Sequence, residues 1–165
     1  MSGGTRSLDI GCGLNPKNPF QANEVYGVDI REEVGRGIVK ADLTVEPIPF
    51  RNDFFDCVTA YDFIEHVPRI IYIPQRRFPF VELMNEIHRV LKPGGLFLSF
   101  TPAFPKAPAW RDPTHVNIIT EETFPMYFCE PQLAASIYGF SGVFHLENQF
   151  WHENQMHLVS VMKKM

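Results

Sequence analysis

The segment Ser7-Leu8-Asp9-Ile10-Gly11-Cys12-Gly13 says more about the fold than any other part of the chain. An apolar run that contains Asp9 leads directly into two glycines with one residue between them. Glycine adopts positive φ at no steric cost and lets the backbone approach a ligand closely. The segment therefore predicts a strand over residues 7–10 that ends in a tight, ligand-binding turn.

A second carboxylate follows at the spacing that such a turn needs. Asp29 closes the apolar run of residues 25–29 and stands sixteen positions after Gly13. In a doubly wound sheet, an acid at the end of the second strand lies beside the glycine turn and can bind a ribose diol. We therefore expect this edge of the sheet to bind a nucleoside-containing cofactor.

The composition of the turn disfavours a dinucleotide. A turn that binds NAD has a third glycine, which lets a helix aim its N-terminus at the pyrophosphate. Here Pro16 takes that place, and the proline-rich residues 14–19 offer no good helix start. The turn resembles instead motif I of the class I S-adenosylmethionine (AdoMet)-dependent methyltransferases, in which an acid stands two residues before the first glycine, as Asp9 does. AdoMet carries a cationic sulfonium. A carboxylate near the glycines attracts this cation, whereas it would repel the phosphates of a dinucleotide.

Further segments resemble the same family, type 11-like class I methyltransferases, in the same order along residues 7 to about 102. They are Ala41-Asp42-Leu43, residues 49–58, Phe63-Ile64-Glu65-His66-Val67 and residues 86–95. The resemblance implies AdoMet as the cofactor, with Asp42 as the acceptor for the adenine amino group. The cofactor-binding residues that we expect are Asp9, Gly11, Cys12, Gly13, Asp29, Ile30, Asp42, Leu43, Tyr61, Asp62 and His66. Simpler interpretations remain open: Asp42 as a solvated acid, Tyr61 as a core aromatic, and Glu65 as a helix cap.

The alternation of apolar strands with amphipathic segments predicts an α/β fold with helices on both faces of the sheet. We expect a Rossmann-like, seven-stranded, mostly parallel sheet in one domain, residues 1–165, with a C-terminal antiparallel hairpin and a minimal N-terminal cap. The expected strands cover residues 7–10, 25–29, 38–41, 55–60, 96–101, 142–151 and 155–162. The expected helices cover residues 75–91, 121–128 and 131–138.

A proline-rich loop, residues 102–117, leaves the fifth strand at its carboxyl end. Loops of this length in compact domains are usually functional, and we expect a mobile lid over the cofactor. Within it, Asp112-Pro113-Thr114-His115 resembles a segment found in some members of the superfamily. A hydroxyl acceptor must lose a proton, so we expect His115 to be a general base that Asp112 orients. The alternatives are that His115 binds substrate or pins the loop. A metal on Glu65, Asp112 and His115 has no support from ligand spacing, and we expect none.

Bulk properties narrow the class of protein. An apolar fraction of 45% and a charged fraction of 21% are globular values, and the net charge of −4 comes without a run of lysine or arginine. We therefore expect a cytoplasmic enzyme with a small-molecule partner and no nucleic-acid or membrane partner. The first expected strand starts near residue 7, without the helices that usually cover the cofactor in this family. A homodimer or a partner subunit could cover the open site.

Three functions from different classes remain open. The first is an AdoMet-dependent methyltransferase that acts on a small-molecule or glycan-like acceptor, at oxygen. The second is an AdoMet-binding but catalytically degenerate subunit that regulates a partner, which the short N-terminal cover suggests. The third is a nicotinamide oxidoreductase, which Pro16 and the expected C-terminal hairpin disfavour.

Overall fold

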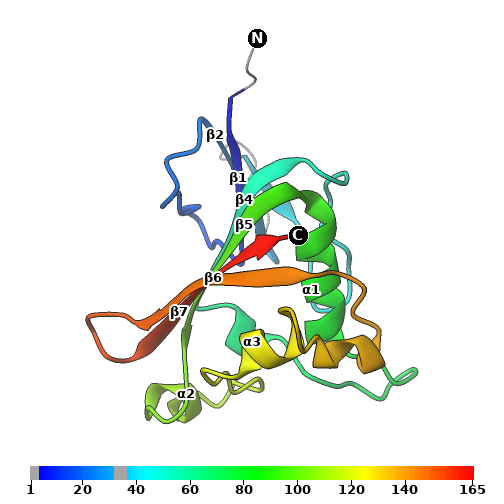
Figure 1. The fold of residues 1–165 in the computed structure, drawn as a ribbon, viewed down its shortest axis with the longest axis vertical. Coiled ribbons are helices and arrows are strands. Elements are labelled where there is room, and N and C mark those ends of the chain that lie inside the picture. Colours follow the sequence, from blue (N-terminus) through cyan, green and yellow to red (C-terminus); the bar gives the residue numbers. More distant parts are fainter. Residues whose placement is uncertain (1–3, 32–36) are drawn as a thin grey trace.

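The computed structural model describes residues 4–31 and 37–165. Seven strands form one sheet in the order β3-β2-β1-β4-β5-β7-β6. The strands are β1 (Arg6–Ile10), β2 (Glu24–Asp29), β3 (Ile38–Lys40), β4 (Phe55–Tyr61), β5 (Leu91–Pro102), β6 (Phe144–Trp151) and β7 (His157–Lys164). The first five are parallel, whereas β7 runs antiparallel to both β5 and β6. The predicted fold class, including the C-terminal hairpin in Figure 1, is confirmed.

The central strands of the sheet are buried on both faces, but their apolar and polar residues alternate along the chain. Leu8 and Ile10 of β1 lie opposite Val58 and Ala60 of β4, and all four side chains are inaccessible to solvent. The alternate positions of these strands carry polar side chains, among them Asp9 and Thr59. The two faces of the sheet therefore differ, one apolar and the other lined by hydrogen-bonding groups.

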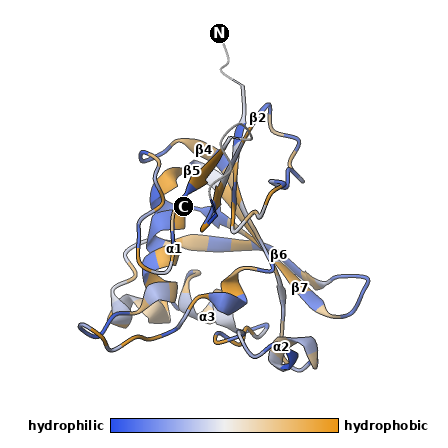
Figure 2. Ribbon diagram, turned by 180° about the vertical axis from the view of Figure 1, so that it is seen from behind, coloured by the Kyte–Doolittle hydropathy of each residue, from blue (hydrophilic) through white to orange (hydrophobic). Residues whose placement is uncertain are grey.

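Helix α1 (Pro79–Val90) lies along one face of the sheet, as Figure 1 shows, and its buried side chains belong to the apolar core. Its buried residues include Leu83, Met84 and Ile87, which recur at the predicted helical spacing. In Figure 2, hydrophilic and hydrophobic residues alternate along this helix, whereas β4 and β5 are mainly hydrophobic. The prediction placed the start of this helix at residue 75. It begins later, because Pro79 suits the first helical turn and residues 71 and 77 pair in an isolated bridge before it.

On the opposite face, the described connection between β1 and β2 differs from the prediction of helices on both faces. Residues 11–23, blue in Figure 1, connect β1 to β2 through turns and bends without a helix. Gly27 allows this segment to pack closely: a Cβ at that position would lie 2.7 Å from Cys12 Sγ and 2.8 Å from Pro16 Cγ. Prolines at 16 and 19 leave too few backbone donors for a helical turn.

Four short helical segments lie at the end of the sheet where the parallel strands terminate or near the hairpin. They are η1 (Ile64–His66), α2 (Pro108–Arg111), α3 (Thr123–Tyr127) and η2 (Ala134–Tyr138). The predicted helix at 121–128 is thus shorter, and the one predicted at 131–138 is a 3₁₀ segment. The latter follows Leu133, whose φ of 46° is left-handed, and ends at Gly139 with φ of 94°. A regular helix cannot extend through such residues.

Across the described ranges, no helix combines the length and apolar character needed to cross a bilayer.

Candidate active site at the carboxyl edge of the sheet

The glycine turn joins the ends of β1 and β2. Gly11 and Gly13 have φ of 65° and 60°, as a turn of this kind requires. The amides of Gly11 and Cys12 both donate to the Val28 carbonyl, at 2.8 and 3.2 Å. The turn is therefore part of the sheet rather than a free loop.

Gly11 also brings the turn against the segment that follows β4. A Cβ at Gly11 would lie 2.3 Å from the Phe63 ring, far inside van der Waals contact. Phe63 directly precedes η1, which carries Glu65 and His66. The absence of a side chain at Gly11 thus places these two groups beside the predicted cofactor turn.

The Asp29 carboxylate lies at the end of β2 and faces the turn. Its Oδ2 accepts a hydrogen bond from Gly13 N at 2.8 Å, and its Oδ1 accepts from Arg31 N at 3.0 Å and from Arg31 Nε at 2.8 Å. Burial alone raises the pKa of Asp29, but the hydrogen bonds from Arg31 and Gly13 outweigh it and lower that pKa below its usual value. Arg31 therefore occupies the oxygens predicted to bind a ribose, and its side chain, 62% exposed, can turn into solvent.

Asp9 supports the turn from inside the sheet. Its Oδ1 accepts from Thr59 Oγ1 at 2.7 Å and its Oδ2 from Lys17 N at 2.8 Å, and the residue is 1% exposed. Burial raises the pKa of Asp9 to about 6. Through these two hydrogen bonds Asp9 fixes the turn and the 14–18 segment, and its contact with a cofactor stays a prediction.

The other expected cofactor residues lie at the same edge of the sheet. Asp42 follows β3 and accepts from Thr44 N at 3.0 Å, beside the buried Leu43. Ile30 is 60% exposed next to Asp29. Burial, with smaller contributions from Asp9 and Asp29, raises the pKa of the Cys12 thiol to about 11, so it is not a thiolate at neutral pH.

Tyr61 and Asp62 close β4 on the side of the hairpin. The Tyr61 ring packs on Phe100 with centroids 5.2 Å apart, and Lys17 Nζ lies 5.9 Å from its centre. Asp62 Oδ1 lies 2.8 Å from His157 Nε2, and the His157 ring stacks on Phe100 at 4.3 Å. The hairpin, through His157, therefore positions an acid of the candidate site.

These groups fit AdoMet by their chemistry. Asp29 and Asp42 end neighbouring parallel strands and offer acceptors for hydroxyl and amino groups, while the Lys17 ammonium beside Tyr61 offers a charge partner for a carboxylate. Gly11 and Gly13, in the turn beside Asp29, have no side chains that would block a ligand.

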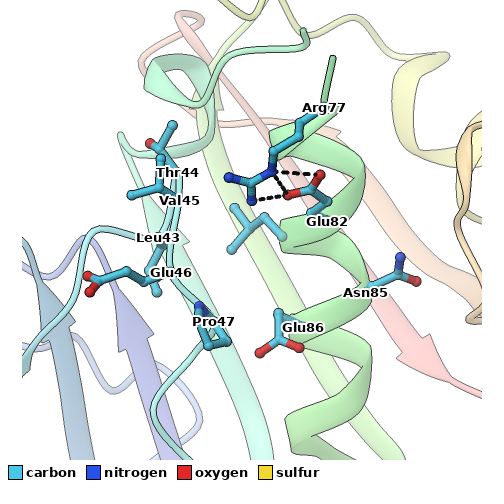
Figure 3. Close-up of a pocket in the computed structure, with 10 residues that line it drawn as sticks. Leu43, Thr44, Val45, Glu46, Pro47, Arg77, Glu82, Asn85 and Glu86 are labelled. Atoms are coloured by element: carbon cyan, nitrogen blue, oxygen red, sulfur yellow. Dashed lines mark hydrogen bonds and ion pairs between the residues drawn. The ribbon is translucent and has the colours of Figure 1, made fainter. Parts of the chain in front are cut away.

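Two pockets flank this edge without coinciding with the glycine turn. The first, in Figure 3, lies between residues 43–47 and α1; it is lined by Glu46, Glu86 and the Arg77–Glu82 ion pair. The second, of about 770 Å³, is apolar and borders the proline-rich loop. Its lining includes Phe78, Phe80, Phe104, Trp110, Met126 and Tyr127.

A cluster of one carboxylate and two imidazoles lies between the turn and the proline-rich loop. One ligand atom each from Glu65, His66 and His115 lies within 4.8 Å of the others. The two imidazole rings meet edge to face, with centroids 4.9 Å apart. Glu65 is 1% exposed, and burial raises the pKa of its carboxyl even though Thr101 Oγ1 donates to Oε2 at 2.7 Å. We refer to these three residues as the Glu-His-His cluster.

The predicted pairing of Asp112 with His115 differs from the arrangement in the structure. Asp112 Oδ1 accepts from Thr114 N at 2.8 Å and from Thr114 Oγ1 at 2.7 Å, and Thr114 Oγ1 lies 3.1 Å from His66 Nδ1. His115 Nδ1 instead lies 3.3 Å from the Ala109 carbonyl. The Asp112 side chain forms an Asx turn, in which it accepts hydrogen bonds from Thr114 and points away from His115. Asp112 thus positions His66 through Thr114.

The sequence interpretation missed several residues of this edge. Arg31 on Asp29, Thr101 on Glu65 and Thr114 on His66 have no motif of their own. Asn117 is fully buried; its Nδ2 donates to the Ile64 carbonyl at 3.1 Å, and its Oδ1 accepts from Arg69 Nε at 2.7 Å. Only the close resemblance of residues 112–117 to a recurring segment could have drawn attention to Thr114 and Asn117.

Comparisons with known proteins agree with this geometry. A family model described as a methyltransferase domain matches residues 8–99. A demethylmenaquinone methyltransferase of Listeria monocytogenes is 33% identical over 126 residues, 66% of this chain and 49% of the relative. A squalene methyltransferase of Botryococcus braunii is 27% identical over 138 residues, 73% of this chain and 34% of the relative. The chain thus spans about half the length, or less, of these curated relatives.

Solved structures share the fold at low identity. An AdoMet-dependent methyltransferase from Archaeoglobus fulgidus has a TM-score of 0.62 at 18% identity, over 98% of this chain and 87% of that one. The [4+2]-cyclase SpnF has a TM-score of 0.64 at 16% identity, over 99% and 76%. A complex of a Haloferax volcanii methyltransferase with its Trm112 activator gives 0.64 at 14%, over 97% and 82%. At these identities the likeness concerns the fold alone.

Proposed function

The chain belongs to the methyltransferase-domain family, and on that premise we propose that it transfers the methyl group of AdoMet to a hydroxyl oxygen of a small-molecule acceptor. The observation that carries this proposal is the Glu-His-His cluster beside the glycine turn, because a hydroxyl acceptor must give up a proton. The curated relatives, of which the chain spans about half, are themselves named methyltransferases.

Different residues at the carboxyl edge bind different parts of AdoMet. AdoMet supplies a methyl group on a cationic sulfonium whose sulfur leaves as a neutral thioether, so no acid is needed at the leaving group. Asp29 holds the ribose hydroxyls once Arg31 has turned away, and Asp42 accepts from the adenine amino group. Asp9 keeps the turn rigid. Since reaction in line depends on positioning, this rigidity contributes directly to the rate.

The acceptor lies on the side of the proline-rich loop. Ala109 holds His115 through its carbonyl, while the neighbouring Trp110 lines the apolar pocket, so one short segment links the cluster to that pocket. Trp110 and Phe104 are 63% and 49% exposed there. Aromatic side chains of this kind bind flat, apolar ligand parts. An acceptor with an apolar or ring-shaped body and a hydroxyl directed at the cluster is therefore favoured over a strongly polar glycan.

A second copy or a partner subunit covers the open side of the turn in this proposal. Residues 11–23 lie there without a helix, and Ile30 is 60% exposed beside Asp29. The structural neighbour from Haloferax volcanii is a methyltransferase bound to an activator. Light scattering after gel filtration distinguishes a monomer from a homodimer.

Turnover with a panel of acceptors tests the proposal. We expect S-adenosylhomocysteine to accumulate when the protein is mixed with AdoMet and a hydroxylated apolar acceptor, such as a quinol or a phenol. Asp29→Ala should lower the rate of this product's formation about tenfold or more at limiting AdoMet. The proposal fails if S-adenosylhomocysteine binds but no hydroxylated acceptor is turned over; that result would favour a degenerate, AdoMet-binding regulatory subunit.

A further inference from the structure

The protons of the two imidazoles in the Glu-His-His cluster are fixed by their hydrogen-bond partners. The Ala109 carbonyl can only accept, so His115 Nδ1, at 3.3 Å, carries the proton. Thr114 gives its single hydroxyl proton to Asp112 at 2.7 Å, so its oxygen accepts from His66 Nδ1 at 3.1 Å. Each neutral ring therefore keeps a lone pair on Nε2.

Histidines that bind metals have the same arrangement, with one ring nitrogen bound to an acceptor and the other free for the metal. A metal-binding histidine typically donates its other ring N–H to a carbonyl or a carboxylate, which fixes the tautomer and orients the ring. His115 has such a carbonyl in Ala109. His66 has the carboxylate of Asp112, reached through Thr114.

Glu65 supplies the third group. Thr101 Oγ1 donates to its Oε2 at 2.7 Å and orients the carboxylate, which has a second oxygen to offer. At 1% exposure the carboxylate is largely removed from water, so a nearby cation compensates for the lost solvation. Glu65 is further fixed because its carbonyl accepts from the amides of Val116 and Asn117, at 2.9 and 3.0 Å.

We propose that Glu65, His66 and His115 bind a divalent transition-metal ion of the Zn²⁺ type. Two imidazoles with one glutamate are the protein ligands of catalytic zinc sites that keep a fourth position open. Each ligand atom then lies about 2.1 Å from the ion, so the three groups draw together by roughly 1 Å through side-chain rotation. Mg²⁺ prefers six oxygen ligands and fits this set poorly.

The open position faces the acceptor side, between the glycine turn and the proline-rich loop. There the ion can bind an acceptor hydroxyl and lower its pKa, so that the proton passes to solvent water and the oxygen takes the methyl group while the sulfur leaves as a thioether; no free histidine base is then needed. This role rests on the proposed methyl transfer, whereas binding of the ion does not. His115 is then a metal ligand, and Thr114 and Asp112 are positioning residues.

Calorimetric titration of the chelator-treated protein with ZnCl₂, and separately with MgCl₂, tests the site. We expect Zn²⁺ to bind at one site and Mg²⁺ far more weakly. His66→Ala and His115→Ala should each weaken Zn²⁺ binding at least about 100-fold, beyond the 10–100-fold typical of residues that only support a ligand. Thr114→Val, which removes only the hydroxyl at His66, should cost about tenfold. His145→Ala is the matched control, because His145 also lies beside a glutamate, Glu130, at 3.2 Å but outside the cluster.

The site is refuted if the wild-type protein binds Zn²⁺ no more tightly than His115→Ala, or if His145→Ala removes the binding. Circular dichroism of each variant confirms that it is folded. Turnover with and without chelator separates this inference from the proposed function. Methyl transfer that persists without Zn²⁺ binding overturns only the metal site, and Zn²⁺ binding without turnover of any acceptor overturns only the proposed activity.

Discussion

At the scale of single residues, Gly11 and Gly13 share a left-handed backbone but have different surroundings. An alanine at either position meets a backbone penalty of roughly 1–2 kcal/mol. Gly11→Ala also drives its Cβ to within 2.3 Å of the Phe63 ring, whereas at Gly13 the nearest atom, on Arg31, is 3.4 Å away. We expect Gly11→Ala to lower the free energy of unfolding by a further 1–3 kcal/mol, roughly the usual cost of overpacking. Urea denaturation of the two variants measures the difference; equal losses would mean that Phe63 does not restrict Gly11.

Asp9 makes stability depend on pH. Because burial raises its pKa to about 6, the folded protein holds the proton more tightly than the unfolded chain, whose Asp pKa is about 3.8. Its contribution to stability is thus present below about pH 4 and is lost as the pH rises through about 6. Between pH 4 and 7, Asp9→Asn should gain up to about 3 kcal/mol of stability relative to wild type.

Denaturation of both proteins at several pH values measures this gain. Asn is the suitable replacement, because its amide oxygen can still accept from Lys17 N. Stability curves that stay parallel between pH 4 and 7 would contradict the buried-carboxyl account.

Residue-level prediction from sequence worked where chemistry and spacing coincide. Asp9, Gly11 and Asp29 carry a recognisable pattern, and the structure brings them to one edge of the sheet. Arg31 has no motif that would predict it, and for Thr114 the resemblance of residues 112–117 indicates the residue but not its contact. Whether such a residue contacts Asp29 or His66 depends on side-chain geometry, which spacing does not encode.

At the scale of elements, the proline-rich loop is fastened at one end. Asn117 donates to the Ile64 carbonyl and accepts from Arg69, and it is fully buried, whereas its neighbour Val116 is 53% exposed. Asn117→Ala removes the hydrogen bonds of a fully buried side chain to the Ile64 carbonyl and to Arg69, and should lower the free energy of unfolding by about 1–3 kcal/mol. Val116→Ala, the matched control, should change it by less than about 0.5 kcal/mol. Thermal or urea denaturation distinguishes the two variants, and equal effects would show that Asn117 does not fasten the loop.

Because the hydrogen bonds of Asn117 hold one end of the loop, we expect only the other part of the predicted lid to move. We expect amide hydrogens of residues 103–111, which include the exposed Phe104 and Trp110, to become more protected when cofactor and acceptor bind. Amides of 116 and 117, which donate to the Glu65 carbonyl, should be protected in both states. Hydrogen exchange followed by mass spectrometry measures both segments. Unchanged protection across 103–111 would make the loop a fixed cover.

Strands were easier to predict than short helices. Apolar runs with a glycine or acid at their ends located six strands to within two residues, whereas β5 begins at Leu91, five residues before the predicted start. The predicted helix at 131–138 failed because its apolar spacing says nothing about the left-handed Leu133. Helix α1 was placed correctly in its body, and its start was fixed by Pro79.

At the scale of the whole molecule, the order β3-β2-β1-β4-β5-β7-β6 brings the ends of β1, β2, β3 and β4 to one edge. That arrangement follows from alternating strands and crossovers, and it was predictable. The unequal covering of the two faces was only partly so. Prolines 16 and 19 indicated a missing helix between β1 and β2, but the close packing of that segment over Gly27 depends on three-dimensional geometry that the sequence pattern does not encode.

We expect this edge of the sheet to bind AdoMet through Asp29. Calorimetry with S-adenosylhomocysteine and with NAD, on wild type and Asp29→Ala, measures this binding. We expect S-adenosylhomocysteine to bind more tightly than NAD, and Asp29→Ala to weaken its binding about tenfold or more, the loss of roughly one hydrogen bond to a charged group. Asp42→Ala should weaken it less, since water can replace a single adenine contact. Tighter binding of NAD, or unchanged affinity in a folded Asp29→Ala variant, would contradict the account.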